Sequence, residues 1–355
     1  MGAGLADDKA KRTAHGDRRR PEAVEQEDSV PTYWKPAMRI AALAAAATIA
    51  ALAPGQAEDE YPSRNITFVC AFPAGSGADV QVRFFADKLG AVIGKPIIVE
   101  NKVGAAGNIA AQYTARSEPD GYTVFVHSGS TIAANMSLFK NPPLDVVKEL
   151  RVAATTNTQA FLLTVRSDAP WKNVRELTEY LKTKGAKASY ATTATPGKVM
   201  GALYKEATGI QAVEVPYRTG PDTVNDMTSG AVDYGMLDPV FALGQMRQGR
   251  FRILAVSTGQ RMKSLPDIPT MTEQGVTMDE VIWWGAMVPA ATPDAIVQKI
   301  NGWFKEVVAS DDAKKFLDSF GADPLITTPA EGQKLFVKAA EDWKKYVRIA
   351  KIPQN

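Results

Sequence analysis

The sequence predicts an α/β protein in which parallel strands are covered by helices on both faces. Short apolar runs of strand length alternate with segments whose apolar residues recur at helical spacing, which is the pattern of such a fold. Apolar residues make up 45% and charged residues 23% of the 355 residues, the balance of a globular protein with an ample core. The sequence has no repeat of 20–50 residues that would indicate a solenoid.

The first 57 residues are expected to lie outside this fold. Residues 1–37 are polar and of mixed charge, so they bury too little apolar surface to order themselves. The 14 residues 40–53 form an uncharged run, and Gly55-Gln56-Ala57 follows with small residues at a cleavage site. This pattern is typical of a secretory signal peptide, and the run is too short for the ~20 residues that span a bilayer. We expect residues 1–57 to be absent from the exported protein, and Met38 is favoured over Met1 as the initiator.

The elements of the first half of the mature chain follow from apolar spacing. Residues 66–71 are a continuous apolar run, and the helix after them places Val82, Phe85 and Leu89 on one face. Pro119-Asp120-Gly121 marks a turn before a further strand. Strands are expected at 66–71, 96–99, 122–126 and 161–165, and helices at 79–90, 108–117 and 174–184.

The second half continues the alternation and then becomes helical. Pro293 and Pro329 suit the first turn of a helix, because proline lacks the N–H that a helix start leaves unpaired. Strands are expected at 189–191, 213–215, 232–237 and 251–257, and helices at 198–208, 223–229, 293–310, 311–320 and 330–349.

Charge and residue counts exclude several function classes. Lys plus Arg is 41 and Asp plus Glu is 39, so no basic excess exists to hold a nucleic acid. Two histidines and a single cysteine exclude a disulfide, a thiolate zinc site and a multi-histidine metal site. Cys70 lies in an apolar run and is expected to be a buried, inert thiol. We therefore expect neither metal nor cofactor.

In open α/β sheets, ligands bind beyond the carboxyl ends of the strands, so the loops there hold the candidate site residues. The first loop, residues 72–79, is rich in small residues that let backbone N–H groups approach an anion at a helix N-terminus. Val80 stands where a dinucleotide fingerprint needs its third glycine. The alternative is a plain turn with Asp79 as N-cap. The candidates in this loop are Phe72, Ala74, Gly75, Ser76, Gly77 and Asp79.

The second loop follows the strand that ends at Val126 and contains His127, Ser128, Ser130 and Thr131, of which the last three are ligand candidates. A serine beside a histidine invites a hydrolase interpretation, but no Gly-x-Ser-x-Gly motif is present. We therefore expect no catalytic residue here.

The third loop, residues 191–198, offers neutral hydroxyl donors with one cation at its end. Its ligand candidates are Thr192, Thr193, Thr195, Gly197 and Lys198. The alternative is a solvated loop with Lys198 extended into water.

Many ordered segments of the mature chain resemble one family. Beyond the first loop, they include Tyr61-Pro62-Ser63-Arg64, Val99-Glu100-Asn101-Lys102, Pro119-Asp120-Gly121-Tyr122-Thr123, Val215-Pro216-Tyr217-Arg218, Leu265-Pro266-Asp267-Ile268-Pro269-Thr270 and Pro289-Ala290-x-Thr292-Pro293. The chain is similar to the Bug family of extracytoplasmic solute receptors of the tripartite tricarboxylate transporter system.

The resemblance implies a two-lobed, type II periplasmic-binding-protein-like fold, each lobe a mixed, mainly parallel sheet flanked by helices. Lobe one is expected at 58–157 plus 258–355 and lobe two at 158–257. In the family, the loops that match the three above line the cleft between the lobes. They grip a small carboxylate there: a di- or tricarboxylate, an aromatic carboxylate or an acidic amino acid. Tyr217 and Asp238 join the ligand candidates, because Asp238 matches an acidic position that meets an ammonium group in amino-acid-binding members.

The resemblance also implies a function: a monomeric periplasmic receptor that delivers its ligand to the membrane components of the transporter, without enzymatic activity. Two alternatives stay open. A sensor that feeds a signalling partner shares the same binding event, and a periplasmic hydrolase would need a general base with an oriented partner.

Departures from the family pattern leave the ligand open. Ser76 stands where the family repeats glycine, and the third loop carries threonines and Lys198 in place of a Gly/Ser-rich segment followed by histidine. A cation at the start of a helix opposes the helix dipole, and an anionic ligand removes that conflict. We therefore predict that Lys198 faces the cleft and pairs with a second carboxylate, which favours a dicarboxylate.

Overall fold

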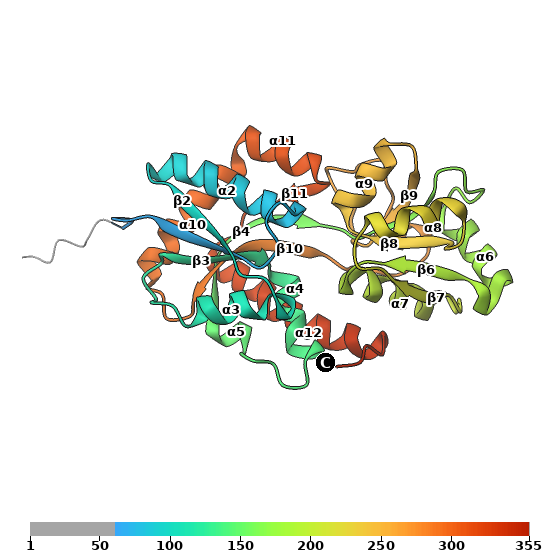
Figure 1. Ribbon diagram of the computed structural model, residues 1–355, viewed down its shortest axis with the longest axis horizontal. Helices are drawn as coiled ribbons and strands as arrows, with labels where there is room; N and C mark the ends of the chain where they lie inside the picture. Colours follow the sequence, from blue (N-terminus) through green and yellow to red (C-terminus); the bar gives the residue numbers. More distant parts are fainter. Residues whose placement is uncertain (1–60, 355) are drawn as a thin grey trace, which may run out of the picture. The chain divides into compact units, whose positions relative to one another are not determined.

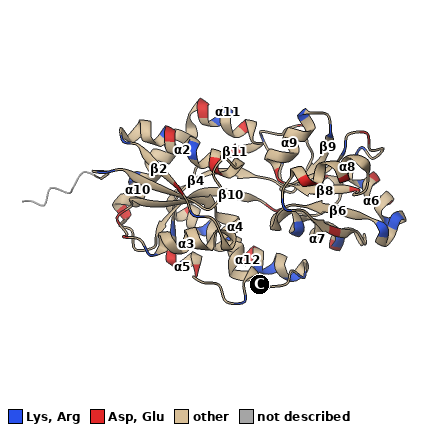
Figure 2. Ribbon diagram, viewed as in Figure 1, with Lys and Arg blue, Asp and Glu red and all other residues tan. Residues whose placement is uncertain are grey.

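The computed structural model describes residues 61–354, so the expected signal peptide lies outside the described residues. In the described part, the strands form two sheets, each flanked by helices (Figure 1). One sheet has six strands in the order β11-β4-β10-β3-β1-β2, and the other has five in the order β7-β6-β8-β5-β9. Figure 2 shows basic and acidic residues interspersed along the helices around both sheets.

The six-stranded sheet carries helices on both faces because its strands bury apolar side chains on both sides. One face packs against α2, α10 and α11 through residues such as Phe85 and Phe304. The other packs against α3, α4, α5 and α12 through residues such as Ile132 and Phe336. The strands are β1 (Ile66–Cys70), β2 (Ile97–Asn101), β3 (Thr123–Ser128), β4 (Leu150–Gln159), β10 (Ile282–Pro289) and β11 (Ala322–Pro324). The helices are α2 (Gly77–Ile93), α3 (Asn108–Ala115), α4 (Gly129–Leu138), α5 (Val146–Glu149), α10 (Asp294–Ala309), α11 (Asp311–Ser319) and α12 (Pro329–Ile349).

The five-stranded sheet is built in the same way. Its faces are covered by α6 with α7, through Leu177 and Tyr204, and by α8 with α9, through Met227 and Leu243. The strands are β5 (Leu162–Arg166), β6 (Ser189–Thr192), β7 (Val213–Pro216), β8 (Tyr234–Leu237) and β9 (Phe251–Val256). The helices are α6 (Val174–Lys184), α7 (Thr195–Thr208), α8 (Val224–Ser229) and α9 (Pro239–Arg247). Short 3₁₀ turns lie at Ala105–Gly107, Gly185–Lys187, Pro221–Thr223 and Thr272–Gln274.

Both sheets are mixed, as predicted, but their parallel content is lower than expected. Among the described strands, β2-β1-β3 and β7-β6-β8 pair in parallel, and the other five of the nine pairings are antiparallel. The difference comes mainly from β4 and β10, which pair with each other along most of their length. The sequence pattern predicts neither strand. In β4 the apolar pattern is broken, because the strand ends in a run of threonine, asparagine and glutamine.

A buried serine ties together the two connections between the sheets. The chain passes from β4 to β5 through Phe161, and it returns to β10 through Glu280. The Phe161 N–H donates to Ser257 Oγ at 3.0 Å, and the Ser257 hydroxyl donates to the Glu280 carbonyl at 2.7 Å. One hydroxyl therefore uses its donor and an acceptor lone pair to hold both connections.

The segment between β9 and β10 packs against the five-stranded sheet, whereas the sequence predicts it in lobe one. Met271 and Met278 belong to the core that contains α6 and α7. The Gln274 amide accepts from Val174 N at 2.8 Å and donates to the Leu254 carbonyl at 2.9 Å. These contacts hold residues 271–278 against the five-stranded sheet, whereas Lys263 N and Ser264 N donate to the Asp323 carboxylate on β11 of the six-stranded sheet, both at 2.7 Å. None of the helices within residues 61–354 is long and apolar enough to cross a membrane.

Candidate ligand-binding site

Four strands lead into the three predicted loops and the turn at Asp238. These strands form two pairs of neighbours. β1 and β3 are parallel neighbours in the first sheet, and β6 and β8 are parallel neighbours in the second. Their carboxyl ends lead into the N-termini of α2, α4, α7 and α9. Each lobe therefore presents two helix N-termini from one edge of its sheet, the kind of position at which backbone N–H groups can bind an anion.

The first loop contacts the second lobe directly. Phe72 and Ala78 pack against the core cluster that contains Phe161 and Met236. A Cβ placed on Gly77 would lie 3.7 Å from Cγ1 of Val240, at the start of α9. The N-termini of α2 and α9, one from each lobe, therefore approach each other.

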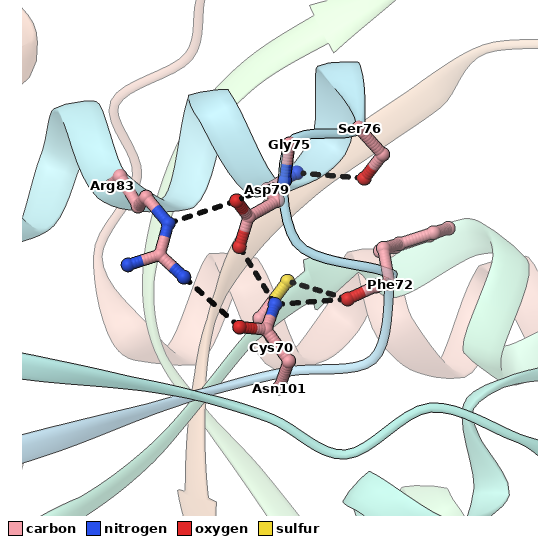
Figure 3. A network of polar contacts seen from close by, with 7 residues as sticks. All are labelled: Cys70, Phe72, Gly75, Ser76, Asp79, Arg83 and Asn101. Atoms are coloured by element: carbon pink, nitrogen blue, oxygen red, sulfur yellow. Dashed lines mark hydrogen bonds and ion pairs between the residues drawn. The ribbon is translucent and has the colours of Figure 1, made fainter.

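Asp79 holds the first loop in place and does not cap α2. The N-cap is Ser76, whose Oγ accepts from Asp79 N at 3.3 Å. Asp79 Oδ2 accepts from Gly75 N and from Arg83 Nε, both at 2.8 Å, and its Oδ1 accepts from Asn101 Nδ2 at 2.7 Å (Figure 3). Both carboxylate oxygens of Asp79 accept hydrogen bonds from other residues of the protein. Asp79 therefore stabilises the loop and does not offer a free oxygen to a ligand.

The charge of Asp79 is stabilised by these contacts. Burial by itself raises the pKa of Asp79, but the hydrogen bonds from Arg83, Asn101 and Gly75 outweigh burial and lower it to about 2. The loop above it is open: Ala74, Gly75 and Gly77 are exposed and Ser76 is half-buried. Gly75 has a φ of +81°, a conformation that residues with a Cβ rarely adopt.

His127 lies in an aromatic stack and not in a catalytic arrangement. Its ring stacks on Phe72, with centroids 4.9 Å apart, and it also neighbours Phe125 and Trp284. Nδ1 lies 2.9 Å from the Ser128 carbonyl, which fixes it as the protonated nitrogen of the neutral ring. Burial lowers the pKa of His127 to about 4, with the bond to Ser128 acting in the opposite direction. The histidine is therefore neutral at physiological pH.

The serines of the second loop have structural partners. Ser128 caps α4, with its Oγ accepting from Thr131 N at 3.1 Å and donating to Thr131 Oγ1 at 3.0 Å. Ser130 Oγ donates to the Val281 carbonyl at 3.2 Å and accepts from Trp283 N at 3.1 Å. Ser130 thus links α4 to the connection that enters β10.

The third loop is shorter than predicted, because α7 begins at Thr195 and not at Lys198. Gly197 lies in the first turn, and a Cβ there would lie 2.3 Å from the Met236 carbonyl oxygen. Only glycine allows this close approach of α7 to β8. Thr193 and Thr195 are half-buried at the start of the helix.

Lys198 is paired with a residue that the sequence did not suggest. Its Nζ lies 3.2 Å from Glu214 Oε2, and Thr192 Oγ1 donates to Glu214 Oε1 at 2.9 Å. Lys198 therefore already has a counter-charge, on β7, and does not extend freely into water. That it pairs with a ligand carboxylate stays a prediction, and such a ligand would have to compete with Glu214.

The two candidates that came from the resemblance also have internal partners. Tyr217 donates its hydroxyl proton to Asp226 Oδ2 at 2.6 Å. Asp238 caps α9, with Oδ1 accepting from Phe241 N at 3.0 Å. Burial raises the pKa of Asp238, and the backbone hydrogen bonds it accepts act against that rise.

The donors that remain for a ligand are backbone N–H groups and threonine hydroxyls at helix starts, which are donor types that suit an anion. Within the described residues, no group of three His, Cys, Asp or Glu side chains is placed to hold a metal ion. The sequence missed Glu214 and the supporting pair Arg83 and Asn101. An acidic residue within the apolar strand Val213–Pro216 was the available signal for Glu214.

Comparison with known proteins identifies the family. Residues 81–352 match the model of the tripartite tricarboxylate transporter family receptor. The chain belongs to this receptor family. Among its relatives, Protein BugT of Bordetella pertussis is 28% identical, over 85% of this chain and 94% of the relative. The predicted family is thereby confirmed.

Two solved structures of similar fold contain small ligands. One, R. palustris Rpa4515 with adipate, is 26% identical with a TM-score of 0.74, over 83% of this chain and 100% of the other. The second, MatC of Rhodopseudomonas palustris with bound malate, is 25% identical with a TM-score of 0.68, over 81% and 100%. The predicted two-lobed binding-protein fold is confirmed by these neighbours. The receptor family is one of periplasmic binding proteins.

Proposed function

We propose that this protein is a periplasmic receptor that captures a small carboxylate between its two lobes and delivers it to the membrane components of a tripartite tricarboxylate transporter. The observation that carries the proposal is the convergence of helix N-termini from both lobes, seen where Gly77 of α2 meets Val240 of α9. Helix N-termini favour anions through their free N–H groups and the helix dipole.

A dicarboxylate is the ligand class that this arrangement favours. α2 and α4 offer donors for one carboxylate in the first lobe, and the start of α7, which no side chain caps, offers donors for a second carboxylate in the other. A ligand with two carboxylates can bind both lobes at once and so favour the closed form. The ligands named for the two solved neighbours, adipate and malate, both have two carboxylates.

A screen of carboxylates by thermal shift, followed by calorimetry, tests the ligand class. A ligand that binds only the folded protein raises its melting temperature by mass action. We expect adipate or malate to bind in the micromolar range or tighter, about −8 kcal/mol, and hexanoate, which lacks the second carboxylate of adipate, to bind at least tenfold more weakly. Equal binding of adipate and hexanoate would contradict the dicarboxylate assignment. A failure of all carboxylates, including citrate, benzoate and aspartate, would contradict the receptor proposal itself.

Closure of the lobes is the second part of the proposal. Trp283 and Trp284 lie at the connection between the sheets, so their fluorescence reports a change there. We expect the ligand to change this fluorescence and to reduce the radius of gyration in small-angle scattering. Identical scattering with and without saturating ligand would count against closure.

The protein is proposed to return its ligand unchanged. His127 is buried, neutral and stacked, so it lacks the oriented partner that a general base requires. Mass spectrometry of the ligand after long incubation should recover the starting compound, and a converted product would favour the hydrolase alternative. Uptake into vesicles that contain the membrane components, dependent on added receptor, separates transport from sensing. Light scattering during size-exclusion chromatography tests the predicted monomer.

Export is proposed to remove residues 1–57. The uncharged run 40–53 and the small residues before Glu58 support cleavage after Ala57. N-terminal analysis of the exported protein should find a start at or within a few residues of Glu58. A mature chain that keeps residues 38–57 would overturn this assignment.

A further inference from the structure

A cavity lies where α12 covers the connection that enters β10, and Ser130 in the first turn of α4 also lines it. Its volume is about 220 Å³, and its wall includes Glu280 from the connection, Trp283 from β10, and Leu335, Ala339 and Trp343 from α12. At about 30 Å³ for each water molecule, this space corresponds to roughly seven waters. The cavity is therefore large enough for a small organic molecule.

Two of the residues that line the cavity carry a buried polar group with no hydrogen-bond partner among the described residues. These groups are the carboxyl of Glu280, at both oxygens, and the indole N–H of Trp283. Glu280 is 2% exposed and Trp283 is 4% exposed. A buried polar group without a partner is costly, so such groups mark places where a ligand can supply the missing contact.

Among the carboxyl groups at the cavity within the described residues, only that of Glu280 has no partner. Asp279 Oδ1 accepts from Gly259 N at 2.8 Å, and Asp342 pairs with both Lys338 and Lys345. Lys338 is itself paired with Asp342, so its charge is already balanced. Aromatic rings are also present, and their faces attract organic cations. Leucine, isoleucine and alanine side chains supply apolar surface for the body of such a ligand.

We propose that this cavity binds a small organic ammonium ion, with the ammonium group against the Glu280 carboxylate and the apolar body against α12. Rotation of the Glu280 side chain into the open space brings its carboxylate to the cation. The ligand has the opposite charge to the proposed carboxylate, and the proposal does not rest on the proposed function.

Binding in this cavity is coupled to release of a proton. Burial raises the pKa of Glu280 well above its usual range, so the empty site holds a neutral carboxylic acid. Formation of the ion pair transfers that proton to solvent. Other ionisable groups at the cavity are Asp279, Lys338, Asp342 and Tyr346. The Tyr346 hydroxyl donates to the Asp279 carbonyl at 3.2 Å, and burial raises the pKa of Tyr346, so it stays neutral.

Calorimetry with benzylammonium tests the site, with benzyl alcohol as its neutral isostere. We expect benzylammonium to bind at least tenfold more tightly than the alcohol at pH 8. Its affinity should fall as pH decreases, by up to tenfold per pH unit while Glu280 is protonated in the empty site. No binding of benzylammonium, equal affinity for the two compounds, or displacement of benzylammonium by saturating adipate would overturn the proposal.

Three variants locate the site. Glu280→Gln should remove the preference for ammonium over alcohol, whereas Glu341→Gln, an exposed carboxylate on α12 outside this cavity, should leave it unchanged. Ala339→Leu fills the cavity without a change of charge and should weaken both compounds at least tenfold. It also keeps the test decisive if Glu280→Gln fails to fold. Unchanged binding in Ala339→Leu would overturn the assignment to this cavity.

Discussion

Lys198 Nζ lies 3.2 Å from Glu214 Oε2, and the two side chains are 32% and 22% exposed. The lysine stands in the first turn of α7, where its charge opposes the helix dipole, and the glutamate of β7 compensates that charge from the neighbouring strand. A ligand that approaches α7 therefore meets one half of an ion pair and not a free cation.

This pairing predicts how two variants change the binding of a dicarboxylate. Glu214→Gln removes the competing carboxylate and should tighten adipate binding about tenfold, or about 1.4 kcal/mol, because a hydrogen bond to a charged group becomes available. Lys198→Ala in the wild-type background should change the affinity less than about threefold, since its charge is already neutralised. Calorimetry measures both. Hexanoate is the control ligand, and a tenfold loss in Lys198→Ala would show that the lysine serves the ligand despite Glu214.

Gly197 should tolerate no side chain. A Cβ there would lie 2.3 Å from the Met236 carbonyl oxygen, so Gly197→Ala must push α7 away from β8. We expect a loss of about 1–3 kcal/mol of unfolding free energy, as for overpacking elsewhere, together with weaker ligand binding. Gly244→Ala is the matched control, because no atom lies within 4 Å of its Cβ position and alanine favours helices over glycine. Urea unfolding should show Gly244→Ala as stable as the wild type or more stable; equal losses in both variants would contradict this account.

Asp79→Asn should destabilise the protein and loosen the first loop. The Asp79 side chain is 1% exposed, and its pKa is about 2 in the folded protein against 3.8 in the unfolded chain. This difference corresponds to roughly 2 kcal/mol of stability, present above pH 4 and lost as pH falls through the folded pKa. Chemical denaturation at pH 7 measures the loss. Asp312→Asn, which breaks the exposed pair with Lys88, is the control and should change little.

His127 should contribute less to the stability of the folded protein as pH falls. A histidine that gains an acidic partner on folding has the opposite effect. The folded pKa of His127, about 4, lies below the ordinary value of 6.5, so the unfolded chain binds a proton first as pH falls. The stability that His127 contributes is then lost progressively below pH 6.5, by about 2 kcal/mol between pH 7 and pH 5. Burial raises the pKa values of Glu280 and Asp238, which act in the opposite direction, so the comparison is made with a variant. Urea unfolding of the wild type and of His127→Phe, which keeps the stack on Phe72, should show about 2 kcal/mol less loss in the variant between the two pH values; an equal pH dependence in both proteins would contradict this role of His127.

The sequence predicted the elements whose identity depends on local pattern. The helix 174–184 agrees with α6 at both ends, since apolar residues follow one face and asparagine caps the start. The turn of the first loop into α2 was also predictable, because glycine, serine and a helix start are adjacent in the chain; anion binding by this loop stays a prediction. Asp79 was placed in the correct loop, but its role as a support was not visible, because Asn101 joins it only through the pairing of β1 with β2.

The sequence by itself determined the fold class, the family and the four strand ends at which a ligand is expected, because each depends on residues close together in the chain. Tertiary structure alone decided that Glu214 neutralises Lys198, that Ser257 joins the two connections, and that Glu280 faces α12 without a partner. Each of these contacts joins residues from different elements. The local sequence pattern shows which residues are polar or apolar. Which charged side chains contact each other is decided only when the sheets and helices pack.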